Sequence, residues 1–241
     1  YPMPIMGFSV NDSSQCFQNN LFQFTDTTSI ASGSFSTLWN FGNGDTSTNS
    51  NPAKVFGYTD TFDITLINSS LLGCTDTITK NVFVHPMPIA SFSVNDTAQS
   101  FQDNNFIFSN NSTIASGGIN YLWDFGDGTS SNAQNPVHIY TTDDTFNVKL
   151  SIISNNGCAD SFDMTVYVFP TPSVNFSIND SAQCFNENNF TFTNSTTINW
   201  GNISYIWYYG DGDTSSSINS SHTYTSDDTF YVKYKTKYHQ I

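Results

Sequence analysis

The sequence has no arginine, a single glutamate (Glu187) and only six lysines among 241 residues, and its formal net charge is −14. Nucleic acids and anionic lipid surfaces are bound by basic patches, so we expect neither as a partner. No apolar run approaches the roughly 20 residues of a membrane-spanning helix, and we expect no membrane insertion in this segment. Strong helix formers are scarce, whereas Ser, Thr and Asn supply 91 residues. This balance, with many Thr, Val, Ile and Phe, predicts a β-rich chain.

What the sequence does contain is one unit repeated every 84 residues. Internal repeats indicate an array of similar structures. The equivalent aromatic residues are Trp39, Trp123, Trp207, Phe62, Phe146 and Phe230. We therefore predict three domains, at residues 1–84, 85–168 and 169–241. Ile241 is equivalent to Gly157, so we expect the third domain to lack the last strand and the chain to be a segment of a longer protein.

Each repeat is predicted to contain about seven short strands. The clearest alternation places Phe146, Val148, Leu150 and Ile152 on one face of a strand. The dipeptide at residues 156–157, Asn-Gly, is typical of a hairpin turn. Short strands separated by turn signals are the pattern of a β-sandwich. The predicted strands of the second repeat cover residues 89–94, 106–109, 119–125, 136–140, 146–152 and 162–169.

The second repeat resembles the PKD (polycystic kidney disease) domain. The resemblance rests on three ordered motifs, Trp-Asp-Phe-Gly-Asp-Gly at 123–128, Asn-Pro-Val-His-Ile-Tyr at 135–140 and Phe-x-Val-x-Leu at 146–150, each with counterparts in the other repeats. The resemblance implies an all-β fold of tandem immunoglobulin-like (PKD-type) β-sandwiches. It also implies an extracellular or cell-surface location, as in bacterial and archaeal surface proteins and adhesins.

The four cysteines fall at two fixed positions of the repeat. Cys16 and Cys184 are separated by two periods, and Cys74 and Cys158 by one. This recurrence predicts a disulfide between Cys16 and Cys74, and hence an oxidising compartment. Ser100 stands at the first position of the second repeat. A bridge between Cys158 and Cys184 is the alternative.

No catalytic motif is present, and we expect no enzyme activity. The sequence contains no HExxH, GxSxG, P-loop, GxGxxG or CxxC pattern. His138 and His222 are equivalent, but Lys54 stands at that position in the first repeat, which argues against a shared catalytic base. No cofactor is expected. Calcium is the metal that acidic turns would hold, although Asp is also an ordinary turn residue. The residues in question are Asp127, Asp143, Asp144, Asp211 and Asp213.

Surface glycosylation is the other modification that the sequence suggests. Asn-x-Ser/Thr and Asp-Ser/Thr patterns recur, and ordinary turn chemistry is the alternative interpretation. The predicted sites are Thr27, Thr77, Thr97, Ser181, Asn68, Asn111, Asn194 and Asn219.

These features predict a non-catalytic structural or adhesive segment of a long secreted or cell-surface protein. The repeats would act as stiff spacers or building units of an adhesin, surface layer or extracellular filament. Their partners would be neighbouring repeats or copies of the same protein, with surface glycans or matrix as further partners. The alternative is an accessory polysaccharide- or protein-binding module of a secreted hydrolase. Trp200 has no aromatic equivalent in the other repeats and is the aromatic residue expected to make a contact. A third option is that a neighbouring chain donates the missing strand.

Overall fold

The computed structural model describes residues 4–71 and 73–239, and the prediction of an all-β chain is confirmed. Its contacts divide it into two compact units. The first comprises Tyr1–Asn95, Ile107–Val137 and Asn147–Met164, and the second Asp96–Phe106, His138–Phe146 and Thr165–Ile241. The division passes through the second repeat, and the repeat limits at residues 84 and 168 stay a sequence prediction.

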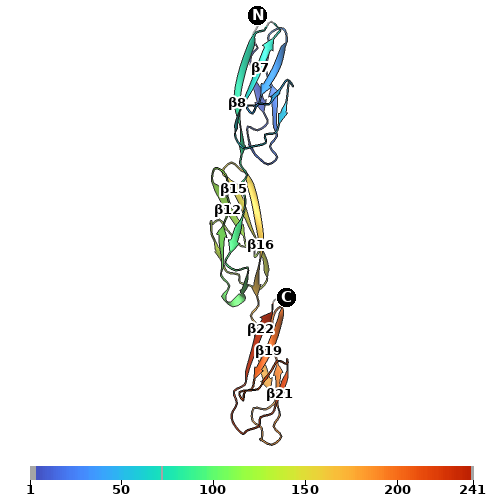
Figure 1. Cartoon of the computed structure of the whole chain (residues 1–241), viewed down its shortest axis with the longest axis vertical. Coiled ribbons are helices and arrows are strands. Elements are labelled where there is room, and N and C mark those ends of the chain that lie inside the picture. Colours follow the sequence, from blue (N-terminus) through green and yellow to red (C-terminus); the bar gives the residue numbers. More distant parts are fainter. Residues whose placement is uncertain (1–3, 72, 240–241) are drawn as a thin grey trace. The chain divides into compact units, whose positions relative to one another are not determined.

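The first repeat consists of two sheets. A three-stranded sheet has the order β1-β3-β6, and a five-stranded sheet has the order β2-β8-β7-β4-β5. The long hairpin of β7 and β8 is labelled in Figure 1. The strands are β1 (Phe8–Val10), β2 (Ser14–Cys16), β3 (Phe22–Asp26), β4 (Phe35–Asn40), β5 (Thr46–Ser47), β6 (Ala53–Lys54), β7 (Thr61–Ser70) and β8 (Thr75–His85).

The two facing sheets enclose an aromatic core. Side chains alternate along a strand, so Phe62, Ile64 and Leu66 of β7 all point inward and are buried. Trp39 of β4 is 0% exposed and lies edge-on to Phe8, with ring centroids 5.1 Å apart. Burial of these rings supplies most of the hydrophobic stabilisation of the sandwich.

The second repeat has the same sheet orders, β9-β11-β14 and β10-β16-β15-β12-β13. Two very short strands, β10 and β13, were not predicted because two or three residues carry no periodicity signal. The elements are β9 (Phe92–Val94), β10 (Ala98–Ser100), the 3₁₀ turn η1 (Phe101–Asp103), β11 (Phe106–Asn110), β12 (Ile119–Asp124), β13 (Ser130–Ser131), β14 (Val137–His138), β15 (Thr145–Ser154) and β16 (Ala159–Phe169).

The third repeat retains the three-stranded sheet but has a smaller second sheet. The sheet orders are β17-β18-β21 and β20-β19-β22. β22 is the counterpart of β15, and β19 pairs with it along its length. Within the described residues no strand corresponds to β16, or to β10, which pairs with β16 in the second repeat. The strands are β17 (Phe176–Ile178), β18 (Phe190–Asn194), β19 (Asn202–Tyr208), β20 (Thr214–Ser215), β21 (Ser220–His222) and β22 (Lys233–His239).

Candidate functional site

The only disulfide among the described residues joins two consecutive repeats. It links Cys16 to Cys158, with Cα atoms 5.6 Å apart and a sequence separation of 142. Cys74 and Cys184 are free. The predicted Cys16–Cys74 bridge is therefore wrong, as is the alternative Cys158–Cys184.

The strand register explains why Cys16 does not reach Cys74. Cys16 ends β2, which runs parallel to the end of β8 and pairs Cys16 with His85. Cys74 precedes the other end of β8, and an extended strand from Cys74 to His85 spans about 36 Å. A disulfide requires Cα atoms within about 7 Å. The two positions therefore lie at opposite ends of the same sandwich.

The disulfide lies beside the peptide connection between the repeats. His85, the β8 partner of Cys16, directly precedes Pro86 of the connecting segment. Cys158 follows the tight turn that ends β15, and it is 1% exposed. Both cysteines belong to the first compact unit. The first and second repeats are thus tied by two covalent links, the main chain and the disulfide.

The junction of the second and third repeats has aromatic contacts and, among the described residues, no disulfide. Ser100 stands at the position of Cys16. Phe169, at the end of β16, packs on Trp200 and Tyr238, with ring centroids 5.7 and 5.0 Å away. Trp200, expected from the sequence to make a contact, thus lies in this cluster. Gly201 has φ +88°, and a Cβ there would meet the Tyr238 ring at 2.4 Å.

A hydrogen bond joins the same two repeats. The side-chain amide of Asn199 donates to both carboxylate oxygens of Asp143, at 3.0 and 3.2 Å. Asp144, the other acidic residue of this predicted calcium site, instead accepts a bond from the backbone N–H of Thr145 at 2.7 Å. Asp143 therefore serves a contact between repeats in this structure.

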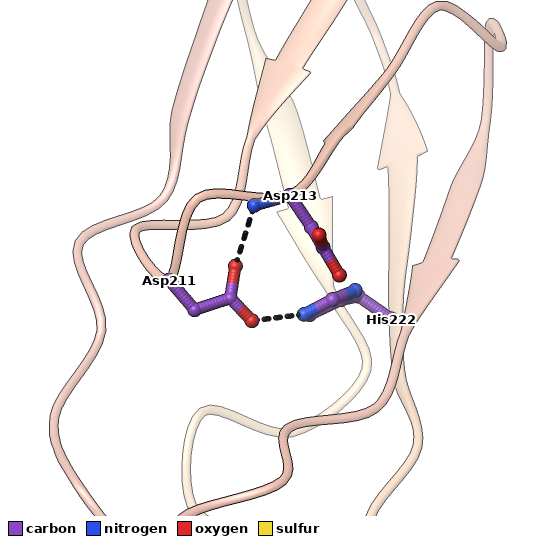
Figure 2. Close-up of side chains that lie close together, drawn as sticks. All are labelled: Asp211, Asp213 and His222. Atoms are coloured by element: carbon purple, nitrogen blue, oxygen red, sulfur yellow. Dashed lines mark hydrogen bonds and ion pairs between the residues drawn. The ribbon is translucent and has the colours of Figure 1, made fainter.

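The described residues contain one group of three side chains with metal-ligand geometry: Asp211, Asp213 and His222, whose ligand atoms lie within 4.8 Å of one another. Figure 2 shows the Asp211 carboxylate between the backbone N–H of Asp213, at 3.0 Å, and the His222 ring, at 2.6 Å. The structure thus brings Asp211 and Asp213 together. It does not place Asp127, Asp143 or Asp144 in such a group.

The equivalent position in the first repeat is filled by a lysine. Lys54 forms an ion pair with Asp45, the counterpart of Asp213, and Asn43 donates to the same carboxylate at 2.9 Å. Lys54 lies on β6, and His222 lies on the equivalent strand β21. In each of these two repeats, a basic side chain of this strand therefore bonds a carboxylate of the turn. Calcium prefers oxygen ligands, and the His222 nitrogen is not one. Calcium binding at this turn stays a sequence prediction.

Both acidic turns show lowered carboxyl pKa values. Burial opposes ionisation of Asp211, but hydrogen bonds from His222 and from the Asp213 N–H outweigh it, so that the pKa of Asp211 is lowered. The hydrogen bond from Lys54, and then that from Asn43, lower the pKa of Asp45. The folded state therefore favours the ionised carboxylates, and acid weakens these links as pH falls through the lowered values.

One predicted glycosylation site is inaccessible. Asn68 is 0% exposed, and its amide donates to Thr28 at 2.9 Å. Folding therefore conflicts with a glycan on Asn68, and this prediction is wrong for the folded chain. Asn194 is half-buried. The remaining predicted sites are exposed: Thr27, Thr77, Thr97, Ser181, Asn111 and Asn219.

A buried asparagine recurs in the three repeats and was not singled out from the sequence. Asn20 accepts a hydrogen bond from the Phe56 N–H at 2.8 Å and donates to the Phe56 carbonyl at 3.1 Å. Asn104 and Asn188 bind Tyr140 and Tyr224 in the same way. The 84-residue spacing of these asparagines was the available signal. In the first repeat, these hydrogen bonds hold the loop that follows β2, the strand that ends at Cys16. In the other two repeats they hold the equivalent loop.

The phenol of Tyr224 lies in the hydrophobic core of the third repeat, and its ionisation provides a test of that core. It is 6% exposed and donates to the Tyr209 carbonyl at 2.8 Å. Burial, followed by the charges of Asp211 and Tyr209, raises the pKa of Tyr224 to about 12. Because the pKa of Tyr224 is higher in the folded chain than in the unfolded chain, this group stabilises the folded state. The stabilisation is complete below the unfolded pKa near 10, and it is lost as pH rises through the folded pKa.

We therefore expect the third repeat to lose about 2 kcal/mol of stability between about pH 9 and pH 12. Tyr224→Phe should lose much of this alkaline dependence, and the ring fits because Phe56 occupies the equivalent position in the first repeat. Urea unfolding at several pH values measures the effect. Tyr231→Phe, at a side chain 86% exposed, is the control and should retain it. Equal pH dependence in the wild type and Tyr224→Phe would contradict the assignment.

The described residues include no helix long and apolar enough to cross a membrane.

Comparison with known proteins identifies the repeated domain. Residues 85–169 match the family model of the PKD domain. Two collagenases of Bacillus cereus are similar over short stretches: ColA is 46% identical over 39 residues, and ColQ1 is 40% identical over 50 residues. These stretches cover 16% and 21% of this chain, but only 4% and 5% of the collagenases.

Among solved structures, the PKD1 domain of the Vibrio cholerae metalloprotease PrtV is 29% identical, with a TM-score of 0.31. The match covers 34% of this chain and 96% of that domain. The family match and the two collagenase stretches fit a non-catalytic repeat or an accessory module. The family match lies on the second repeat. Its motifs have counterparts in the first and third repeats. The first repeat has the same strand order, and the third has the same order without counterparts of β10 and β16 among the described residues. The chain is therefore a tandem array of PKD-type, immunoglobulin-like domains.

Proposed function

We propose that this chain is a non-catalytic structural segment of a secreted or cell-surface protein, in which PKD-type repeats act as spacers or building units of an adhesin, surface layer or filament. The observation that carries the proposal is the Cys16–Cys158 disulfide between consecutive repeats. A bond inside one domain would stabilise that domain alone. A bond between domains limits their relative motion, which is useful in a spacer that must hold its length.

The chemistry of the bond also supports the extracellular location. Structural disulfides persist in oxidising compartments and are rare in the cytosol. The aromatic cluster of Phe169, Trp200 and Tyr238 and the Asn199–Asp143 hydrogen bond supply a non-covalent counterpart at the next junction. Both junctions thus contain contacts beyond the main chain.

The proposal predicts that loss of the disulfide loosens the first junction. In small-angle X-ray scattering, the variant Cys16→Ser with Cys158→Ser should give a broader distribution of interatomic distances than the wild type. The matched control, Cys74→Ser with Cys184→Ser, removes two thiols that form no bond in the chain and should leave the distribution unchanged. Identical distributions for wild type and the bridge variant would refute a stiffening role.

An accessory binding module is the second function, and the similarity to two collagenases favours it. In this function the repeats would hold a hydrolase on an insoluble polymer, such as fibrous protein or polysaccharide. Sedimentation of the wild-type chain with collagen fibrils or cellulose tests it. The spacer proposal expects the chain to stay in the supernatant. Saturable co-sedimentation would favour the accessory module instead.

A further inference from the structure

The turn between β19 and β20 of the third repeat holds two carboxylates beside an imidazole. Asp211 and Asp213 contribute −1 each and His222 is counted as neutral, so the group has a formal charge of −2 at pH 7. The Asp211 carboxylate accepts hydrogen bonds from His222 and from the Asp213 N–H. Among the described residues, the Asp213 carboxylate itself has neither a hydrogen bond nor an ion pair. The charge of this group is therefore not balanced by a basic side chain.

The first repeat places a cation at the same position. Lys54 forms an ion pair with Asp45 of the turn. Its ammonium nitrogen lies 5.8 Å from the ring centroids of both Phe41 and Phe56. The other acidic position of this turn is occupied by Asn43, which is uncharged. One ammonium group therefore balances one carboxylate, and this corner of the sandwich accommodates a positive charge.

The third repeat has tyrosines at the positions of those two phenylalanines, and they hold the His222 ring. Tyr209 stacks on it, with ring centroids 4.1 Å apart and an interplanar angle of 2°, and Tyr224 contacts it edge-on at 4.6 Å. The His222 side chain is 11% exposed. Figure 2 shows its Nε2 directed at the turn, 2.6 Å from Oδ2 of Asp211. The imidazole is therefore already oriented to offer a nitrogen to an ion at the turn.

We propose that Asp211, Asp213 and His222 bind a divalent transition-metal ion, and we assign Zn²⁺ to this site. One ligand atom of each side chain lies within 4.8 Å of the other two. Zinc bonds of about 2.0–2.2 Å place tetrahedral ligand atoms roughly 3.3 Å apart. The Asp211–His222 contact therefore has to open slightly and the Asp213 carboxylate has to move inward, which side-chain rotation allows. A divalent ion neutralises the two carboxylates, as the Lys54 ammonium neutralises one in the first repeat.

The donor atoms favour zinc over calcium. Calcium takes six to eight oxygen ligands, whereas one of the three donors here is an imidazole nitrogen, which suits zinc and its neighbours. Three protein ligands with water in the fourth position form a known type of zinc site. The bound ion would connect the turn to β21, and an ion that binds only the folded state stabilises it. We therefore expect zinc to stabilise the third repeat.

Isothermal titration calorimetry of the whole chain with zinc chloride tests the assignment. The parent for all titrations is the variant Cys74→Ser with Cys184→Ser, because free thiols also bind zinc. We expect one Zn²⁺ per chain. Asp213→Asn should weaken binding by at least about tenfold, since loss of even a hydrogen-bond partner of a ligand typically costs about 10–100-fold. His138→Gln, at the equivalent histidine of the second repeat, is the matched control and should leave the affinity unchanged.

The substitution His222→Lys separates metal binding from folding. Lysine is the residue of the first repeat at this position, so the variant should retain a link between the turn and β21 through an ion pair. Zinc binding should be lost, because an ammonium group has no lone pair to offer. Hydrogen exchange of the β21 amides without zinc should match that of the parent. Added zinc should slow this exchange in the parent and leave it unchanged in the variant.

Titrations with two further ions test the class of metal. Co²⁺ in a four-coordinate site has a characteristic visible absorption, which we expect in the parent and not in His222→Lys. Absence of this absorption from the parent would contradict the proposed coordination. An excess of Ca²⁺ should not displace zinc, and displacement would overturn the assignment to a transition metal.

Zinc binding of unchanged affinity in Asp213→Asn or His222→Lys would overturn the inference, as would a parent chain that binds no zinc. None of these results bears on the scattering experiment with Cys16 and Cys158, because the disulfide lies outside the third repeat. Failure of this inference is therefore distinguishable from failure of the proposed function.

Discussion

Replacing Trp123 with alanine is expected to lower the free energy of unfolding of the second repeat by about 3–5 kcal/mol. The Trp123 ring is 0% exposed. It packs on Phe92 and Phe108, with ring centroids 4.9 and 5.5 Å away, and its indole N–H donates to the Ala133 carbonyl at 2.9 Å. A domain of this size has a total stability of about 5–15 kcal/mol. The loss would therefore remove a large share of it.

Hydrogen exchange followed by mass spectrometry in the intact chain measures this loss locally. Amides of β12 and β15 should exchange much faster in Trp123→Ala, while those of β4 and β7 in the first repeat should not change. Leu122→Ala is the matched control, because Leu122 lies on the opposite face of the same strand and is 50% exposed. Equal effects of the two substitutions would contradict the assignment of Trp123 to the core.

The second large effect is expected at Gly126, in the turn after β12. Gly126 has φ +80°, and a Cβ there would lie 2.8 Å from the Asn147 carbonyl oxygen of the adjacent strand. Gly128 has a similar φ of +87°, but a Cβ at that site would have no other group within 4 Å. Gly126→Ala therefore incurs both a conformational cost of about 1–2 kcal/mol and a clash with main-chain atoms. Gly128→Ala incurs the conformational cost alone.

Scanning calorimetry distinguishes the two alanine variants. Both should lower one unfolding transition, and Gly126→Ala should lower it clearly more than Gly128→Ala. The same close approach occurs at Gly42 and Gly210, whose Cβ positions would meet main-chain atoms of Asp63 and Tyr231 at 2.9 and 3.0 Å. A similar loss in both variants would show that the contact with Asn147 does not restrict this turn.

Most of the fold could be predicted because its signals are local or periodic. Trp123 and the alternation from Phe146 to Ile152 indicated the core, and the 84-residue period indicated the repeats. The disulfide could not be predicted in the same way. The sequence showed that cysteines recur at two positions, but the choice of partner depends on which end of the sandwich each position occupies. That information lies in the pairing of β2 with the far end of β8.

The acidic turns show a similar limit. Sequence placed Asp211 and Asp213 together because they share one turn, and the structure does so too. The sequence pattern did not include His222 in this group, because His222 lies on β21 and reaches the turn only through the fold. The fully buried Asn68 shows the converse limit: a glycosylation motif reports residue types, whereas accessibility depends on the sheet that contains them.

The central claim is that the disulfide joins two repeats, and cleavage at methionine with cyanogen bromide tests it directly. Methionines stand at positions 3, 6, 87 and 164. Cys16 and Cys74 therefore fall in the fragment 7–87, and Cys158 falls in the fragment 88–164. We predict that these two fragments stay joined without reductant and separate when reductant is added. Fragments that are already separate before reduction, with an internal Cys16–Cys74 bond in 7–87, would contradict the account.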